Sequence, residues 1–334
     1  MGGWVNLLTV TVYTRENCSL CQDVVQDLEG LKETIPHELV LIDIEEKNLE
    51  ARFGEDVPIV EVGPYQLKAP FDKKTLRMTL SAARDRKSQL DKIGDQKHQD
   101  RIQRGGNISA ADRFFYWLSN HYMWVFNGFV ALYVGLAVLA PVLQAEGIGG
   151  PANILYGIYG RLCHQLSFRS WFIFGEQSAY PRALAGVQGL TAYAEATGFD
   201  PSDLITAHQF VGNSTLGFKL ALCQRDIAIY GSMLFFGILF MVTGKRLKSL
   251  PVIWWVILGI APIGLDGLSQ LISQLPLDFL PVRESTPFLR TLTGALFGFT
   301  TAWFGYPLVE ETMVETRKVM AVKFSAVRQK EARG

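Results

Sequence analysis

The chain has 334 residues, and its 32 lysines and arginines balance 32 aspartates and glutamates, so the net charge is zero. This length favours two domains, and the balanced charge gives no indication of a nucleic-acid partner. Charged residues are dense up to Arg113 and sparse from Phe114 to Leu308, which divides the chain into a charged N-terminal part and a largely apolar remainder.

The N-terminal part contains a pair of cysteines at the start of a predicted helix. An apolar run with strand character, Leu7 to Tyr13, leads into Cys18 and Cys21, and a helical pattern follows. The backbone N–H groups and the dipole at a helix N-terminus stabilise a thiolate, so we expect a lowered pKa for Cys18. Cys21 lies one turn further along, where it can attack a mixed disulfide on Cys18. A Cys-x-x-Cys can also be half of a zinc site, but the chain has no second one, which favours redox chemistry.

The elements that follow fit a small α/β domain. We expect a second strand over Glu38 to Ile44, a third from Val57 to Val60, a fourth over Tyr65 to Lys68 and a helix over Asp72 to Arg86. The segment from residue 7 to about residue 90, with Cys18-Ser19-Leu20-Cys21 and Val57-Pro58, resembles a glutaredoxin-like thioredoxin fold. The resemblance implies that Cys18 and Cys21 are catalytic, that Pro58 is a cis-proline beside them, and that glutathione is a candidate partner. Ser19 and Leu20 replace the aromatic residue or proline usual in the family, which bears on the redox potential.

The second half contains four long apolar runs, each near the roughly 20 residues needed to cross a bilayer. They are Tyr122 to Leu143, Ile227 to Thr243, Val252 to Ile272 and Phe288 to Leu308. Buried helices of a large soluble protein are the alternative, but tryptophans and tyrosines flank the runs, as at the two interfaces of a membrane. The sequence therefore predicts a thioredoxin-like α/β domain and an all-α four-helix transmembrane domain with an extended outward-facing loop region. The predicted boundaries are 1–90 for the thiol domain, 91–113 for a polar linker, 114–310 for the membrane domain and 311–334 for a basic cytoplasmic tail.

The distribution of lysine and arginine predicts the orientation. Ten of them lie between Lys73 and Arg104, three follow the second apolar run, and six follow Leu308. These three segments lie on one side if all four runs span, and the positive-inside rule makes that side the cytoplasm. No signal-peptide pattern precedes Leu7. We therefore expect a multi-pass protein of the cell (inner) membrane with both termini in the cytoplasm and residues 146–222 outside.

Four polar blocks interrupt the apolar half. They are Cys163-His164-Gln165 with Arg169-Ser170, Cys223-Gln224-Arg225-Asp226 before Ile229-Tyr230-Gly231, Asp266-Gly267 with Gln270, and Arg283-Glu284-Ser285-Thr286 with Arg290 and Thr293-Gly294. In this order they resemble an uncharacterised family of multi-pass membrane proteins, a domain of unknown function whose second block is Cys-x-Arg-Cys. Asp226 stands where that family has its second cysteine, and an extra segment of about 179–220 separates the first two blocks.

Four of these residues form a predicted metal site. Cys223 and Asp226 are three residues apart and share a helix face. Together with Cys163 and His164 they offer thiolate, imidazole and carboxylate groups, all of which bind zinc. Two alternatives remain open, a disulfide between Cys163 and Cys223 and a pair of inert buried thiols.

A second polar site is predicted inside the spans. Asp266 lies within a predicted spanning helix, where a charge is costly unless it is paired or faces a cavity. Arg290 on the fourth helix is the expected partner, and Gln270 and Arg283 are expected beside them. A structural ion pair and a functional pocket are equally favoured interpretations of this group.

These features support three hypotheses for the function. The first is a membrane-bound thiol–disulfide oxidoreductase, with glutathione, a cytoplasmic thiol protein or a quinone as candidate partners. The second is a zinc-dependent membrane enzyme that acts on a lipid or peptide through Cys163, His164, Cys223 and Asp226. The third is a small transporter or scaffold, which would require a homo-oligomer because four spans are few for transport. An oxidoreductase is the favoured enzyme class, and the lipid bilayer is a partner in all three.

Overall fold

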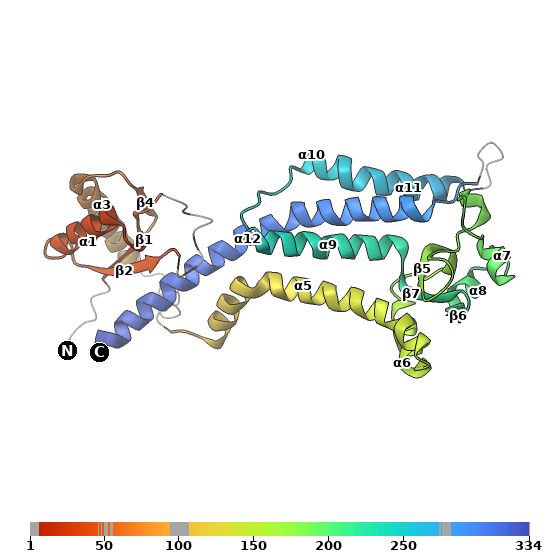
Figure 1. The fold of residues 1–334 in the computed structure, drawn as a ribbon. Coiled ribbons are helices and arrows are strands. Elements are labelled where there is room, and N and C mark those ends of the chain that lie inside the picture. The colour runs from red at the N-terminus through yellow and green to blue at the C-terminus, as the bar shows by residue number, and fades with distance from the viewer. Residues whose placement is uncertain are drawn as a thin grey trace. The chain divides into compact units, whose positions relative to one another are not determined.

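The computed structural model describes residues 7–45, 47, 49, 53, 56–93, 107–273, 275 and 282–333. The chain forms two compact units, residues 1–122 with 310–334, and residues 123–309. Part of the predicted linker, residues 94–106, lies outside the described residues. The predicted boundaries at 113/114 and 310/311 fall inside the helices α5 (Ala110–Ala145) and α12 (Pro287–Arg333), since neither helix is interrupted there (Figure 1).

The first unit contains a four-stranded sheet. Its strands are β1 (Leu8–Thr14), β2 (His37–Asp43), β3 (Ile59–Val62) and β4 (Tyr65–Lys68), in the order β2-β1-β3-β4. The pair β1–β2 is parallel and the other two pairs are antiparallel. Two helices accompany the sheet, α1 (Ser19–Leu31) and α3 (Lys73–Ile93). This is the predicted thioredoxin-like arrangement, and α3 continues past the predicted end at Arg86.

Each face of this sheet is covered by a different set of apolar side chains. Alternate residues of a strand point to opposite faces. Val10 and Val12 therefore pack with Leu28 and Leu80 from the two helices. On the other face, Tyr13 and neighbouring strand residues pack against Val314 and Ala321 of α12. The segment that was predicted as a basic tail is thus a helix that completes the core of the thiol-bearing unit.

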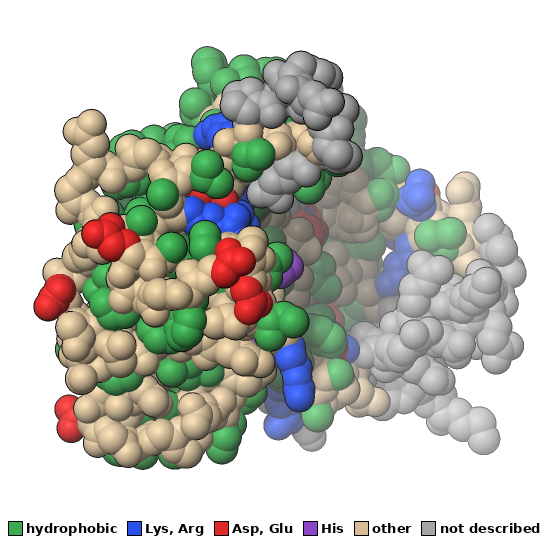
Figure 2. All heavy atoms as spheres, turned by 90° about the vertical axis from the view of Figure 1, so that its right-hand side faces the viewer, with side chains coloured by type: hydrophobic (Ala, Val, Ile, Leu, Met, Phe, Trp, Pro, Cys, Tyr) green, Lys and Arg blue, Asp and Glu red, His purple; other side chains and the backbone are tan. Residues whose placement is uncertain are grey.

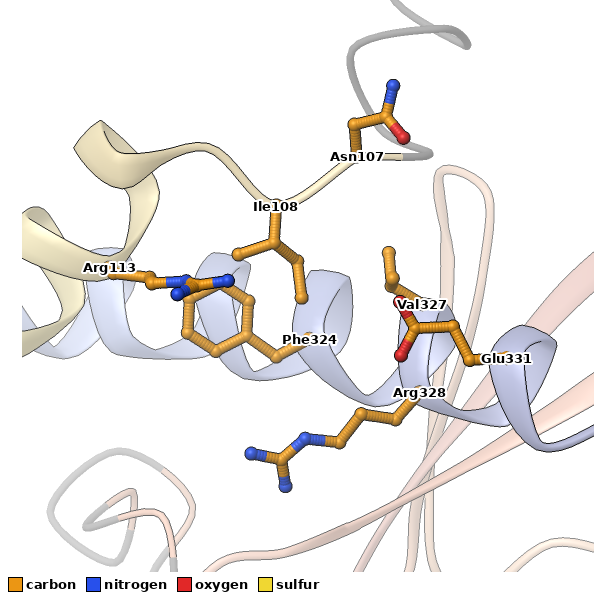
Figure 3. Close-up of a pocket in the computed structure, with 7 residues that line it drawn as sticks. All are labelled: Asn107, Ile108, Arg113, Phe324, Val327, Arg328 and Glu331. Atoms are coloured by element: carbon orange, nitrogen blue, oxygen red, sulfur yellow. The ribbon is translucent and has the colours of Figure 1, made fainter.

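Ion pairs and polar contacts add to this packing of α12. Lys318 Nζ lies 2.7 Å from a carboxylate oxygen of Glu61 on β3. The buried Arg317 donates to the Ser119 carbonyl at 2.5 Å and pairs with Glu310. The end of α12, the start of α5 and the residues before it line a pocket of about 620 Å³, which Figure 3 shows. The pocket is lined by Asn107, Ile108, Arg113, Phe324, Val327, Arg328 and Glu331.

Helices make up most of the second unit. Among the described residues, three helical segments are long and apolar enough to cross a membrane, namely α5, α9 (Gln224–Val242) and the continuous segment Val252–Ser273. That segment comprises α10 (Val252–Trp255), the π-helical turn η3 (Val256–Ile260) and α11 (Ala261–Ser273). The predicted fourth run, Phe288 to Leu308, is helical as part of α12 but is not one of the three. Its glycine, threonine and tryptophan residues reduce its mean hydropathy.

Small residues bring the helices of this unit close together. A Cβ added at Gly294 of α12 would lie 2.6 Å from the Arg225 carbonyl oxygen of α9, and one at Gly298 would lie 2.1 Å from that of Ile229. The two contacts advance in the same direction along both chains, so α9 and α12 are parallel neighbours. Such close approach at small residues is typical of helix pairs in membranes, where dispersion contacts replace the hydrophobic effect.

The predicted loop region, residues 146–222, has secondary structure of its own. It begins with α6 (Gly149–Tyr159) and contains the short helices η1 (Ser167–Arg169), η2 (Ala183–Ala185), α7 (Tyr193–Thr197) and α8 (Leu204–Gln209). The strands β5 (Ser170–Ile173), β6 (Gly212–Asn213) and β7 (Gly217–Cys223) form an antiparallel sheet in the order β5-β7-β6. Figure 2 shows this face of the molecule, where hydrophobic side chains lie among scattered acidic ones.

We predict that Val314→Ala destabilises the thioredoxin-like unit by about 2 kcal/mol, because it removes two buried carbons and leaves a cavity beneath the sheet. Val314 is 5% exposed, whereas Val319 on the same helix is 52% exposed. Val319→Ala is therefore the matched control and is expected to leave stability nearly unchanged. Chemical denaturation of the full chain, followed by protease susceptibility of the N-terminal segment, measures both. Equal effects of the two variants would show that α12 does not belong to this core.

Candidate functional site

The first group of functional side chains is the cysteine pair of the thioredoxin-like unit. Cys18 is the N-cap residue of α1, and its sulfur accepts a hydrogen bond from the Cys21 backbone N–H at 3.2 Å. The two cysteines form a disulfide. Cys21 is buried and Cys18 is half-exposed, so Cys18 is the sulfur that a substrate can reach. The attacking role of Cys18 stays a prediction.

A shallow pocket of about 370 Å³ adjoins the disulfide. Both cysteines line it, together with Thr14, Arg15, Asn17, Gln22, Val25, Gln26 and Leu41. Polar and apolar side chains both line it, which suits an extended thiol-containing peptide or a small thiol.

Pro58 directly precedes β3, which pairs with β1, the strand that leads to the cysteines. The Val57–Pro58 peptide bond is cis, as the sequence predicted. Ile59 is paired with Tyr13, so Pro58 adjoins the end of β1 from which the chain passes to Cys18. Pro58 is not one of the residues lining the pocket.

The second group lies in the membrane-domain unit and contains the other two cysteines. Cys223 ends β7 and is the N-cap of α9, where its sulfur accepts the Asp226 backbone N–H at 3.5 Å. Cys163 follows α6, and its backbone N–H bonds to the Tyr159 carbonyl at 2.8 Å. One ligand atom each from Cys163, Cys223 and Asp226 lies within 4.8 Å of the other two. We call these three residues the cysteine–aspartate group.

His164 stands apart from this group. Its side chain is exposed, and its carbonyl accepts a hydrogen bond from His208 Nδ1 at 2.7 Å. The structure thus brings together three of the four predicted metal ligands. The next residue, Gln165, is buried and donates to the Ala221 carbonyl at 2.6 Å. This hydrogen bond anchors the loop of Cys163 to β7.

The two thiols of the cysteine–aspartate group differ in character. They form no disulfide in this structure. A hydrogen bond from Cys163 lowers the pKa of Cys223, and the same bond, with burial, raises the pKa of Cys163. Cys223 is therefore the more acidic of the two thiols. Such a pair suits either a metal ligand set or a redox couple.

A third group of polar residues surrounds Asp266 and Glu284. Asp266 is 4% exposed and pairs with Arg225 at 2.5 Å and with Arg283 at 3.0 Å. Arg290 pairs instead with Glu284 and donates to Gln270 Oε1 at 2.8 Å. The predicted pairing of Asp266 with Arg290 is therefore wrong. Arg225 and Arg283 form the ion pairs of Asp266, and Arg290 forms its ion pair with Glu284 in the loop before α12.

Ser285 and Gln270 connect the ion pairs of Asp266 to the ion pair between Arg290 and Glu284. Ser285 Oγ donates to Asp266 at 2.9 Å, and its carbonyl accepts from Arg290 Nε at 3.2 Å. Gln270 donates to the Asp266 carbonyl at 2.9 Å while it accepts from Arg290. The four residues predicted for this site, Asp266, Gln270, Arg283 and Arg290, thus belong to one hydrogen-bonded network.

Sequence reasoning missed several members of the network. Arg169 bonds to Glu284 with two nitrogens, at 3.0 and 3.1 Å, and Arg182 lies 3.6 Å from the same carboxylate. Arg225 and Arg169 stand inside the polar blocks noted in the sequence, so they could have been found there. Arg182 comes from the extra segment and carries no such signal.

Lys219 was also missed, and it is fully buried in β7. Its Nζ donates to the carbonyls of Gln165 at 2.7 Å and His208 at 2.6 Å. Burial lowers the pKa of Lys219 to about 7. The side chain ties the strand to the loop after Cys163, and its position among apolar strand residues gave no indication of this.

Two family models match separate parts of the chain. A family model described as a glutaredoxin-like domain (DUF836) matches residues 9–81, and one described as a predicted membrane protein (DUF2085) matches residues 208–304. The second match includes Cys223, Asp226, Asp266 and Arg290, and begins after Cys163.

One curated relative is uncharacterized protein MJ1492 of Methanocaldococcus jannaschii. It is 25% identical over 210 residues, which cover 60% of this chain and 100% of the relative. No solved structure matches the chain. The two family matches confirm both resemblances noted in the sequence, and the chain is a fusion of a glutaredoxin-like domain (DUF836) with a DUF2085 predicted membrane protein domain.

Proposed function

We propose that the chain is a membrane-bound thiol–disulfide oxidoreductase whose redox couple is Cys18 and Cys21. The observation that carries this proposal is the half-exposed Cys18 sulfur at the N-cap of α1, bonded to the buried Cys21. A helix N-terminus stabilises the thiolate form of such a sulfur, which makes it both a good nucleophile and a good leaving group. The membrane domain keeps this chemistry at a membrane.

The exchange reaction follows from the accessibility of the two sulfurs. When the pair is oxidised, a substrate thiolate attacks Cys18 Sγ, the Cys18–Cys21 bond breaks, and Cys21 leaves as a thiolate that takes up a proton. A second substrate thiolate attacks the substrate sulfur of this mixed disulfide, and Cys18 leaves. The substrate is oxidised by two electrons and the cysteine pair is reduced by two. The reverse sequence reduces a substrate disulfide.

The candidate partners are those with a thiol or a two-electron carrier. Glutathione or a cytoplasmic thiol protein suits the open pocket beside Cys18. A membrane quinone is a candidate oxidant of the reduced pair, since it accepts two electrons and two protons to become a quinol.

Our proposal for the topology places both termini in the cytoplasm and the protein in the inner membrane. It is supported by the three lysine- and arginine-rich segments of the sequence. In this arrangement α12 is the fourth span.

A second candidate function belongs to the cysteine–aspartate group. Two sulfurs and a carboxylate oxygen within 4.8 Å of one another suit zinc, and three protein ligands leave a coordination position open for water or substrate. Zinc held by Cys163, Cys223 and Asp226 would supply Lewis-acid chemistry on a lipid or peptide. A disulfide between Cys163 and Cys223 is the competing use of the same residues.

The redox proposal predicts opposite behaviour of two serine variants. Cys21→Ser is expected to accumulate a mixed disulfide between Cys18 and glutathione, because the resolving thiol is absent, and Cys18→Ser is expected to exchange only at the background rate. Incubation with oxidised glutathione, followed by peptide mass spectrometry, locates the adduct. An adduct on Cys21 in the Cys18→Ser variant, at a rate equal to that on Cys18, would contradict the assignment.

The topology predicts which of two exposed serines an impermeant thiol reagent labels. In a cysteine-free background, Ser202→Cys is expected to react in intact cells, and Ser88→Cys only after the cells are opened. Both serines are exposed, so protection reports the membrane rather than burial. Labelling of Ser88→Cys in intact cells would reverse the proposed orientation.

The metal proposal predicts that Cys223→Ser and Asp226→Ala lower bound zinc from about one ion per chain to about zero, measured by elemental analysis of purified protein. His164→Ala is the matched control and is expected to retain zinc, since His164 is exposed outside the group. Loss of zinc in the control would restore His164 as a fourth ligand. A wild-type protein without zinc whose stability falls on reduction would favour the disulfide.

A further inference from the structure

Five arginines gather at one end of the membrane-domain unit. They are Arg169, Arg182, Arg225, Arg283 and Arg290, and we call them the arginine cluster. They come from η1, the segment after β5, the first turn of α9, the loop before α12 and the first turn of α12. Among the described residues, two carboxylates form ion pairs with them, those of Asp266 and Glu284.

The charges of the cluster do not balance. Glu284 is shared by three of the arginines and Asp266 by two. Asp200 adds a weaker attraction at Arg182. Within the part of the chain that the structure describes, five guanidinium groups therefore face three carboxylates. Both paired carboxylates are nearly inaccessible to solvent, with side chains 3% and 2% exposed. Like charges held this close in a region of low dielectric are costly unless an anion joins them.

Helix ends add to the positive potential. The close contacts of Gly294 and Gly298 with α9 make α9 and α12 parallel neighbours, so the N-termini of both helices lie at this end. The dipole of each helix gives its N-terminus a partial positive charge that favours anions. The arginines thus reinforce a potential that the backbone already provides.

Several donors of the cluster are not used within the described part of the chain. The Nε atoms of Arg182 and Arg225 are buried without a hydrogen-bond partner. The side chains of Arg169, Arg225 and Arg283 are 27%, 24% and 38% exposed, so a ligand can approach them. Figure 2 shows basic side chains beside an acidic one at the surface of this face.

We propose that the arginine cluster binds a phosphate group, with Arg169, Arg225 and Arg283 as its contacts. Guanidinium groups match the oxygens of phosphate through paired hydrogen bonds, and several together match its multiple oxygens. The cluster lies where candidate membrane spans begin and end, which is the depth of lipid headgroups. The phosphate is therefore that of an anionic lipid or a free phosphate ion. Neither proposed function is needed for this inference.

The position also relates the phosphate to the cysteine–aspartate group. Arg225 stands between Cys223 and Asp226 in the first turn of α9, and Ser170, which follows Arg169, is paired with Cys223 across the sheet. A phosphate held by these arginines would lie next to the two thiols.

Thermal unfolding of the full-length protein in detergent tests the proposal with matched probes. Dioleoyl phosphatidic acid and dioleoylglycerol share their acyl chains and differ only in the phosphate, and sodium phosphate is compared with sodium chloride at equal ionic strength. We expect the midpoint to rise by about 3 °C or more with a phosphate-bearing probe. A rise with phosphatidic acid alone identifies a lipid phosphate, and a rise with both identifies the phosphate group itself. No rise with either overturns the proposal.

Variants locate the site. Arg225→Gln and Arg283→Gln are expected to abolish the rise, and Arg161→Gln, at an exposed arginine outside the cluster, is expected to keep it. If the glutamine variants do not fold, Arg225→Lys and Arg283→Lys are used instead. These variants retain the positive charge beside Asp266 but lack the planar guanidinium group with its paired donors. Their affinity for the phosphate-bearing probe is expected to fall about tenfold. Wild-type affinity in these lysine variants, or a rise that survives in the glutamine variants, shows that the cluster is an ion-pair lock and overturns the proposal.

Discussion

The pairing of Asp266 is the constraint on which the arrangement of the membrane domain depends. An aspartate within an apolar helix must be neutralised or surrounded by donors, because desolvation of a lone carboxylate costs several kcal/mol or more. Asp266 meets this need with Arg225 from α9, Arg283 from the loop before α12, and Ser285. Three segments far apart in the sequence are therefore brought to one point. The contacts of Gly294 and Gly298 then allow α12 to lie directly against α9.

The same pairing positions the cysteines. Arg225 is two residues after Cys223 and one before Asp226. Its ion pair with Asp266 therefore fixes the first turn of α9, which carries the candidate metal ligands Cys223 and Asp226. Cys163 is brought to them separately, by Gln165 and Lys219, whose hydrogen bonds connect its loop to β7. The ion-pair network and the cysteine–aspartate group therefore share one structural base, the junction of β7 and α9.

Much of this could be predicted from the sequence, and the reasons for the rest are physical. The thioredoxin-like strands and the placement of Cys18 follow from local patterns of alternation and capping, which a sequence displays directly. The partner of Asp266 does not follow from local patterns, because a buried carboxylate requires a nearby positive charge but does not specify which one. Arg290 was expected there since it lies on the fourth helix, yet it pairs with Glu284 instead. The packing of Val314 and Ala321 on the sheet was also not predicted, because the lysines and arginines of 311–334 indicated a basic cytoplasmic tail.

In both domains a cysteine sulfur caps the N-terminus of a helix, and the residue three positions later determines which bonds that sulfur can form. Cys18 and Cys223 are both N-cap residues whose sulfurs accept the N–H of residue i+3, at 3.2 and 3.5 Å. In the first case residue i+3 is Cys21, so a disulfide closes within one turn. In the second it is Asp226, where the resembling family has a cysteine. A carboxylate cannot form that bond, so the only sulfur within reach of Cys223 among the described residues is that of Cys163, from a different segment. The aspartate thus removes a local dithiol from the membrane domain and leaves a thiol pair whose separation depends on tertiary structure.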